Sequence, residues 1–163
     1  MKWWENEKVS VLWTVVRIWL GVQWMEAGWH KVTGGFDAGG FLQGALGKAG
    51  GEHPAVQGWY AAFLEGFAIP NIELFNVLIP WGELFVGIGL ILGFMTIPAL
   101  LAGAFMNLNF LLAGTVSTNP ILYTAAVILL FAGGGAYYWG ADRLLIPFMK
   151  QLVHHKGKHH VVV

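Results

Sequence analysis

The stretch Ile72–Met95 reads IELFNVLIPWGELFVGIGLILGFM and contains only two charged residues, Glu73 and Glu83. A helix needs about 20 predominantly apolar residues to cross the hydrocarbon core of a bilayer, which is roughly 30 Å thick. This stretch is long enough and apolar enough to do so. It therefore predicts a membrane-spanning helix over residues 72–95.

Three further stretches have the same apolar character, and they cover residues 9–29, 97–114 and 120–139. The whole chain agrees with them, since 56% of its 163 residues are hydrophobic and 11% are charged. Soluble domains carry roughly 25% charged residues. We therefore predict an all-α membrane protein, a four-transmembrane-helix bundle that forms a single integral membrane domain over residues 1–163.

The segments between and after these stretches also carry a pattern. The loop 31–70 is Gly-rich and then amphipathic, and it is too long for a structureless link. It predicts short interfacial helices in an outer, extracellular loop. The tail 142–163 combines apolar residues with Lys and His, which predicts an amphipathic segment on the inner lipid surface.

The distribution of positive charge predicts the orientation in the cell membrane. Six of the nine Lys and Arg residues lie before the first predicted span or after the fourth. Loops and ends rich in Lys and Arg stay on the cytoplasmic side. We therefore expect a multi-pass protein whose N- and C-termini, including the tail 142–163, are cytoplasmic.

Composition excludes several kinds of site and partner. The chain has no Cys, which excludes disulfides and iron–sulfur clusters. Its net charge is zero, so no excess of positive charge favours nucleic acid. His30 and His53 lie outside the predicted bundle core and the other four His residues lie in the tail, so we expect no haem and no structural metal. Membrane lipids are the expected partners, and any redox chemistry must belong to a lipophilic cofactor or a partner subunit.

Charged residues inside the predicted spans are the first candidates for a functional site, because a charge in a bilayer needs a partner or a watery cavity. Counting along the antiparallel spans puts Arg17 and Glu83 near the middle of the membrane, which predicts an ion pair between them. Asn107 and Asn109 of the third span lie at a similar depth. Helix periodicity places Trp24 on the same face as Arg17.

Pro80 adds a second reason to expect a polar pocket at this depth. Its ring nitrogen cannot donate to the carbonyl of Asn76, so that acceptor is free and the helix is expected to kink. Trp81 follows directly in the sequence. Two interpretations stay open: a ligand pocket, or an ion pair that only fixes the helix register.

Glu26 and His30 form a third feature, near the outer end of the first span. They are four residues apart, a spacing at which side chains meet on a helix. One interpretation is a proton relay between a buried site and the outside. The other is a pair of solvated residues at the lipid headgroups.

Four motifs follow one another along the chain, with a defined order and spacing. They are Arg17-x2-Leu20-Gly21-x5-Ala27-Gly28-x2-Lys31, Gly82-Glu83-x3-Gly87, Met106-Asn107-x-Asn109-Phe110-x2-Ala113-Gly114 and the group Tyr137, Tyr138, Gly140, Asp142 and Arg143. Together they resemble the DoxX/DoxD-like family of small four-helix membrane proteins, and more closely its DoxD-like branch.

The resemblance implies a function that composition alone does not. A well-known member of the family is the membrane subunit of a thiosulfate:quinone oxidoreductase, which joins two thiosulfates into tetrathionate and passes the electrons to quinone. That enzyme has a second redox subunit. By this resemblance we expect a quinone-linked membrane oxidoreductase or its membrane subunit, with quinone as cofactor and a second redox subunit as partner.

The candidate residues divide into three sets on this hypothesis. Those with catalytic roles are Glu83, Arg17, Glu26 and His30. Those expected to bind the quinone are Arg17, Trp24, Asn76, Trp81, Glu83, Asn107 and Asn109. Those expected to meet an anionic sulfur substrate outside the membrane are His30 and Lys31. Two alternatives stay open, a non-catalytic scaffold subunit of a respiratory or redox-stress complex and a small carrier or channel.

Overall fold

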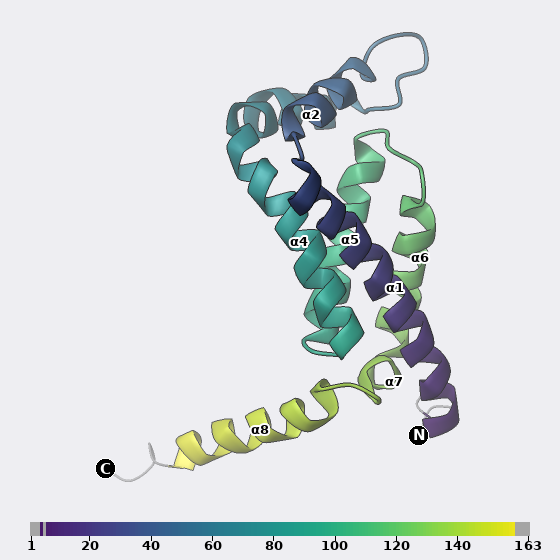
Figure 1. Cartoon of the computed structure of the whole chain (residues 1–163), viewed down its shortest axis with the longest axis vertical. Helices are drawn as coiled ribbons and strands as arrows, with labels where there is room; N and C mark the ends of the chain where they lie inside the picture. The colour runs from purple at the N-terminus through teal and green to yellow at the C-terminus, as the bar shows by residue number, and fades with distance from the viewer. Residues whose placement is uncertain (1–3, 5, 159–163) are drawn as a thin grey trace.

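The computed structural model describes residue 4 and residues 6–158 of the chain. Over these residues the protein contains helices and no strands, which confirms the predicted all-α class (Figure 1). The last part of the predicted tail, residues 159–163, lies outside the described residues.

The longest helices pack side by side as a bundle (Figure 1). They are α1 (Glu7–Gly34), α4 (Ile72–Leu92), α5 (Thr96–Leu112) and α6 (Asn119–Ala132). Each corresponds to one of the predicted apolar stretches, although α1 extends five residues beyond its predicted end at residue 29. Their core is built around Leu20, Trp24, Leu90, Leu100 and Leu129, which are almost fully buried.

A helical cap covers one end of the bundle, and we call it the cap from here on (Figure 1). It consists of α2 (Ala38–Gly47), α3 (Gly58–Phe63), the π-helical turn η2 (Leu64–Ala68) and the 3₁₀ turn η3 (Ile69–Asn71). Two short helices were predicted in this loop. The second one is continuous with α4 rather than separate, so that one helical segment runs from Gly58 to Leu92.

That 35-residue segment is the one helix in the described part of the chain that is long and apolar enough, by itself, to cross a membrane. The apolar helices α5 and α6 are shorter. The helix α1 is long, but its length includes Arg17, Glu26 and Lys31.

The fourth predicted span, residues 120–139, is interrupted in the structure. The helix α6 ends at Ala132, Gly133 has a φ of 53°, and a short helix α7 (Gly134–Tyr137) follows. Three consecutive glycines weaken the helix because glycine loses the most backbone freedom on folding. Gly135 also permits close packing, since a Cβ there would lie 2.8 Å from Cδ1 of Trp13.

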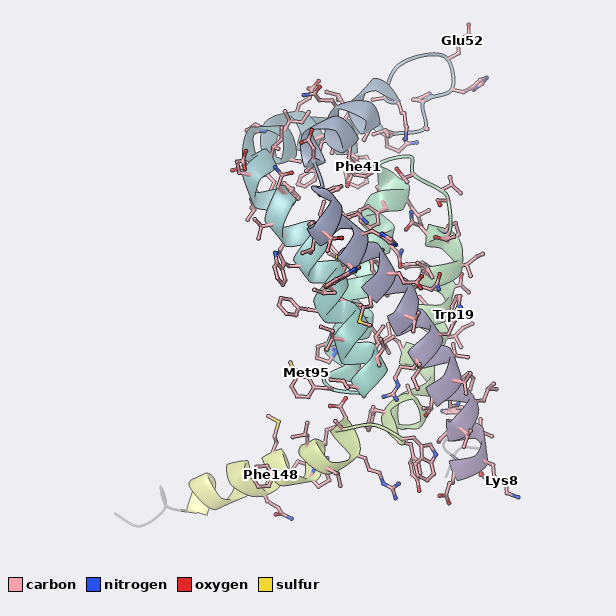
Figure 2. The ribbon with its side chains drawn as sticks, in the orientation of Figure 1. Lys8, Trp19, Phe41, Glu52, Met95 and Phe148 are labelled. Carbon is pink, nitrogen blue, oxygen red and sulfur yellow. The ribbon has the colours of Figure 1, made fainter. Side chains whose placement is uncertain are left out.

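After α7 the chain forms α8 (Asp142–Lys158), which projects sideways from the bundle (Figure 1). In Figure 2, the labelled residues Lys8, Met95 and Phe148 lie toward the end of the molecule opposite Glu52. Glu52 marks the loop of the cap, so both described ends of the chain are remote from the cap.

Glycines set the register between the antiparallel helices α1 and α4. A Cβ at Gly28 would lie 2.6 Å from the backbone nitrogen of Leu84, and one at Gly87 would lie 2.5 Å from that of Met25. Such approaches leave no room for a side chain, so the two backbones touch. This close contact brings the last turns of α1 alongside the middle of α4.

Candidate functional site

An ion pair between Lys31 and Glu83 joins α1 to α4 next to the cap. Nζ of Lys31 donates a hydrogen bond of 2.7 Å to Oε2 of Glu83. The side chain of Glu83 is only 2% exposed, while that of Lys31 is 27% exposed. The carboxylate is therefore buried and its charge is balanced by a lysine that reaches the molecular surface.

A cavity of about 260 Å³ opens beside this pair. Both Lys31 and Glu83 line it, together with the aromatic side chains of Trp24, Phe36, Phe41 and Phe110. The remaining wall comes from the turn between α5 and α6 and from neighbouring residues of α1 and α6, namely Thr115, Ser117, Thr118, Asn119, Gln23, Ala27 and Leu122. We call this space the polar cavity, because it combines an ion pair, hydroxyl groups and aromatic rings.

The predicted ion pair between Arg17 and Glu83 is not formed, because Lys31 occupies the position of the cation. The glycine contacts place Glu83 at the level of Gly28. Gly28 is eleven positions after Arg17, which corresponds to about 16 Å along a helix that rises about 1.5 Å per residue. Counting from the ends of the predicted spans gave the wrong register, since α1 is longer than its apolar stretch.

Arg17 instead lies at the opposite end of the bundle. It is 1% exposed, and its Nη2 donates a hydrogen bond of 2.9 Å to the carbonyl oxygen of Trp139. A side chain at Gly93 or at Gly140 would collide with the guanidinium. Arg17 therefore fills the junction between α1, the turn after α4 and the segment that precedes α8.

Asp142 completes this junction, which we call the inner junction. Its carboxylate accepts hydrogen bonds from the backbone nitrogens of Met95 and Thr96, at 2.8 and 2.7 Å. It thereby caps the first turn of α5, where backbone N–H groups lack helical partners. Asp142 is also close enough to Arg17 for a favourable Coulombic interaction. These contacts give the motif residues Arg17, Gly140 and Asp142 a structural role.

The three candidate asparagines lie in three different environments. The side-chain oxygen of Asn76 accepts a hydrogen bond of 2.7 Å from the backbone nitrogen of Ala38, and so holds α2 against α4. Asn109 accepts a hydrogen bond of 3.1 Å from the hydroxyl of Tyr60 in the cap. Neither residue lines the polar cavity.

Asn107 is buried next to the polar cavity. Its side-chain nitrogen donates a hydrogen bond of 2.9 Å to the side-chain oxygen of Asn119, which lines the cavity. Its own side-chain oxygen has no hydrogen-bond partner among the described residues. The same holds for Nε1 of Trp24, whose ring lines the cavity. Two polar atoms of the buried core next to the cavity therefore have no hydrogen-bond partner among the described residues.

The two candidate tryptophans face opposite directions. Trp24 is 2% exposed and lies in the core beside the cavity, as predicted from the periodicity of α1. Trp81 is exposed on the outside of α4, where its ring packs against Phe85 with centroids 5.8 Å apart. Pro80 remains inside one continuous helix, α4.

Glu26 and His30 both lie on the exposed face of α1. The structure does not show the expected pair between Glu26 and His30. The ion pair found among the described residues is the one between Lys31 and Glu83. Neither Glu26 nor His30 lines the polar cavity.

Reasoning from the sequence missed the polar residues of the turn between α5 and α6. Ser117 takes a positive φ of 38° there, and Asn119 opens α6 at the cavity wall. The sequence did contain a signal for Lys31, which follows Gly28 on the same stripe of α1 as Trp24. Had the first helix been predicted to extend to Gly34, Lys31 would have been placed at the level of Glu83.

Comparison with known proteins supports the family resemblance. Among curated proteins and among solved structures, none matches this chain. A family model described as DoxX matches residues 12–117, roughly two-thirds of the sequence. The match includes Lys31, Glu83 and the first part of the turn at the polar cavity, and it establishes that the chain belongs to the DoxX family.

Proposed function

We propose that the chain crosses the cell membrane four times as one domain, with α1, α4, α5 and the α6–α7 segment as the spans. Large apolar side chains on the outer face of the bundle support this topology, among them Phe85, Phe105 and Phe131, which are 64%, 67% and 81% exposed. Such surfaces are rare on soluble proteins and ordinary in contact with lipid. The cap then lies on the outer side, and α8 lies with the N-terminus on the cytoplasmic side.

Within that membrane domain, the polar cavity is proposed to hold the head group of a quinone, so that the chain serves as a membrane subunit of a quinone-linked oxidoreductase. The observation that carries this proposal is the buried Lys31–Glu83 pair on the cavity wall. A buried ionisable pair in a membrane protein marks a functional site by default, because burial of charge is costly.

The residues present fit a quinone head. Its carbonyl oxygens need hydrogen-bond donors, and the wall offers the ammonium of Lys31 and the hydroxyls of Thr115 and Thr118. The rings of Phe41 and Phe110 provide apolar surface for the flat head group. When bound, a quinone supplies an acceptor for two electrons and two protons.

Glu83 and Lys31 are proposed to handle the protons. Lys31 donates a hydrogen bond to Oε2 of Glu83, and a carboxyl group within reach of the cavity can hold or release a proton at that atom. Lys31 is partly exposed, so it connects the buried carboxylate to the surface. Glu26 and His30, on the exposed face of the same helix, are the proposed next groups on this route toward the outside.

The proposed electron donor is a small sulfur oxyanion of the thiosulfate class, oxidised by a second redox subunit on the outer side. Two thiosulfate anions that join into tetrathionate release two electrons, which matches the two that a quinone accepts. Lys31 and His30 supply positive or protonatable groups where an anion would approach. This pairing follows the DoxD-like branch of the family.

A second candidate function is a non-catalytic scaffold subunit. The observation in its favour is a pair of exposed tryptophans, Trp29 at the end of α1 and Trp59 in α3, which are 58% and 64% exposed. Exposed aromatic residues are enriched at protein–protein interfaces. On this alternative the cap docks a partner and the polar cavity binds no cofactor.

Mass spectrometry of the lipids that co-purify in a mild detergent tests the quinone proposal. Wild type is compared with Glu83→Gln and with Glu73→Gln, a matched change at an exposed position in the first turn of the same helix, α4. We expect quinone with wild type and Glu73→Gln, and its loss from a folded Glu83→Gln variant. Equal retention by all three proteins, or phospholipid alone in wild type, would overturn the proposal.

A further inference from the structure

A second cavity of about 330 Å³ lies beneath the cap, between α4 and α5. We call it the apolar cavity, since aromatic and aliphatic side chains make up almost all of its wall. Tyr60, Phe63 and Phe67 line it from the cap, and Phe75 and Phe105 line it from α4 and α5. The proposed function does not use this cavity.

The polar groups in its wall are already satisfied. The hydroxyl of Tyr60 lies 3.1 Å from the side-chain oxygen of Asn109, and the side-chain nitrogen of Asn109 donates to the carbonyl of Phe105 at 2.8 Å. Among the residues that the structure describes, no charged side chain lines the cavity. It therefore offers hydrocarbon contacts only, and its ligand must be a hydrocarbon group.

One pair of rings separates the apolar cavity from the polar cavity. Phe41 of α2 and Phe110 of α5 line both spaces, and their rings meet edge to face with centroids 5.8 Å apart. Figure 2 shows Phe41 where the cap meets the bundle. The polar and apolar cavities are thus adjacent, and the side chains of Phe41 and Phe110 line both of them.

The apolar cavity also has a rim that faces the proposed lipid phase. Leu78 and Phe105 line it and are 55% and 67% exposed on the outside of α4 and α5. A chain that enters from the bilayer between these helices reaches the ring pair without crossing a charged surface.

From this juxtaposition we infer that the apolar cavity binds the hydrocarbon tail of the same amphiphile whose head group occupies the polar cavity. The inference rests on the proposed function, which concerns the head group, and it adds a binding site for the hydrocarbon tail. The occupant is a ligand with a flat polar head joined to a long hydrocarbon chain, of which an isoprenoid quinone is the proposed example. The chain passes the Phe41–Phe110 pair.

The test compares two quinones with the same ring, one without a tail and one with a ten-carbon chain, by calorimetric titration of the purified protein in detergent. Leu78→Trp narrows the rim at an exposed position. Leu74→Trp is the matched control, because Leu74 is 50% exposed one turn earlier and lines neither of the two cavities. The uptake of each quinone by protein-free micelles is measured separately and the affinities are corrected for it, because micelles take up the tailed quinone more than the tailless one.

Wild type and Leu74→Trp are expected to bind the tailed quinone at least about tenfold more tightly than the tailless one, because several buried methylenes add affinity. In Leu78→Trp this preference should fall below about threefold, while affinity for the tailless quinone stays the same. An unchanged preference in Leu78→Trp, or no preference in wild type, would overturn the inference. Failure of either quinone to bind wild type would instead overturn the head-group site itself.

A second measurement does not depend on a variant. A quinone with a photoreactive diazirine at the end of its chain is irradiated in the complex, and the modified peptides are identified. Attachment within residues 60–79 or 105–110 supports the inference. Attachment confined to the exposed face of α6 contradicts the inference. A phospholipid that stays bound to the protein when the tailed quinone is added also contradicts it.

Discussion

Lys31 binds Glu83 through a hydrogen bond of 2.7 Å across 52 positions of the chain, although Arg17 is the more deeply buried cation of the same helix. Lys31 and Arg17 therefore serve opposite ends of the bundle. Lys31 balances a carboxylate at the polar cavity, whereas Arg17 holds the inner junction together. This division separates a proposed functional charge from a structural one.

The ion pair predicts a characteristic pattern of stability. Lys31→Met leaves a buried carboxylate without its partner, which should cost up to about 3 kcal/mol in the free energy of unfolding. Adding Glu83→Leu should recover most of that loss, because the double variant has no uncompensated charge. Unfolding curves in detergent measure both effects. A double variant that is no more stable than Lys31→Met would contradict the proposed burial of this pair.

Arg17 should affect stability and leave ligand binding intact. Arg17→Gln removes the guanidinium that donates to the carbonyl of Trp139, and about 1–3 kcal/mol of stability should be lost. Quinone retention by the folded variant should equal that of wild type, since Arg17 lies far from the polar cavity. Loss of quinone from Arg17→Gln without loss of stability would indicate that Arg17 contributes to quinone binding.

The hydrogen bonds that Asp142 accepts at the N-terminus of α5 lead to the next prediction. Asp142→Ala removes the acceptor for the backbone nitrogens of Met95 and Thr96, and we expect a cost of about 0.5–2 kcal/mol. Asp142→Asn keeps one acceptor oxygen and should cost less. Thermal unfolding of the three proteins checks the order. If Asp142→Asn were as unstable as Asp142→Ala, charge rather than capping would account for the role of Asp142.

The glycine contacts between α1 and α4 are tested by a single methyl group. Gly87→Ala places a Cβ against the backbone of Met25, so the helices must separate at a cost of about 1–3 kcal/mol. Gly34→Ala serves as the control, because no atom lies within 4 Å of a Cβ at the end of α1. Equal unfolding midpoints for the two variants would show that the helices do not approach so closely.

The sequence predicted the helical class and the approximate position of each bundle helix, because long apolar runs depend on composition alone. It did not predict which residues meet across α1 and α4. That register depends on Gly21, Gly28 and Gly87, whose missing side chains let two backbones touch at one alignment. A count of residues from the end of an apolar stretch contains no such information.

The same limit explains which residues of the candidate site could be identified from the sequence and which could not. Glu83, Trp24 and Asn107 were identified because a polar or large side chain on the inner face of a helix is visible in the pattern. Ser117 and Asn119 were missed, since they come from a turn whose direction depends on tertiary contacts. Trp81 was expected to bind the quinone, and the structure places it on the outside of α4, away from the lining of the polar cavity.

The absence of native cysteines makes the proposed topology directly testable. Single cysteines are introduced at Glu52 in the cap loop and at Lys150 on α8, both of which are exposed. A membrane-impermeant maleimide added to intact cells should label Glu52→Cys, and it should label Lys150→Cys only after the membrane is opened. Labelling of both sites in intact cells would contradict a four-span protein with a cytoplasmic C-terminus.

The most direct test of the central claim is infrared difference spectroscopy of the protein with bound quinone, recorded before and after electrochemical reduction. If Glu83 handles protons beside the quinone, reduction should change a carboxyl band that is present in Glu73→Gln and absent in Glu83→Gln, whose weakened site is filled by adding excess quinone. The quinone carbonyl bands should also shift in Lys31→Met. Identical difference spectra for wild type and Glu83→Gln would contradict the account.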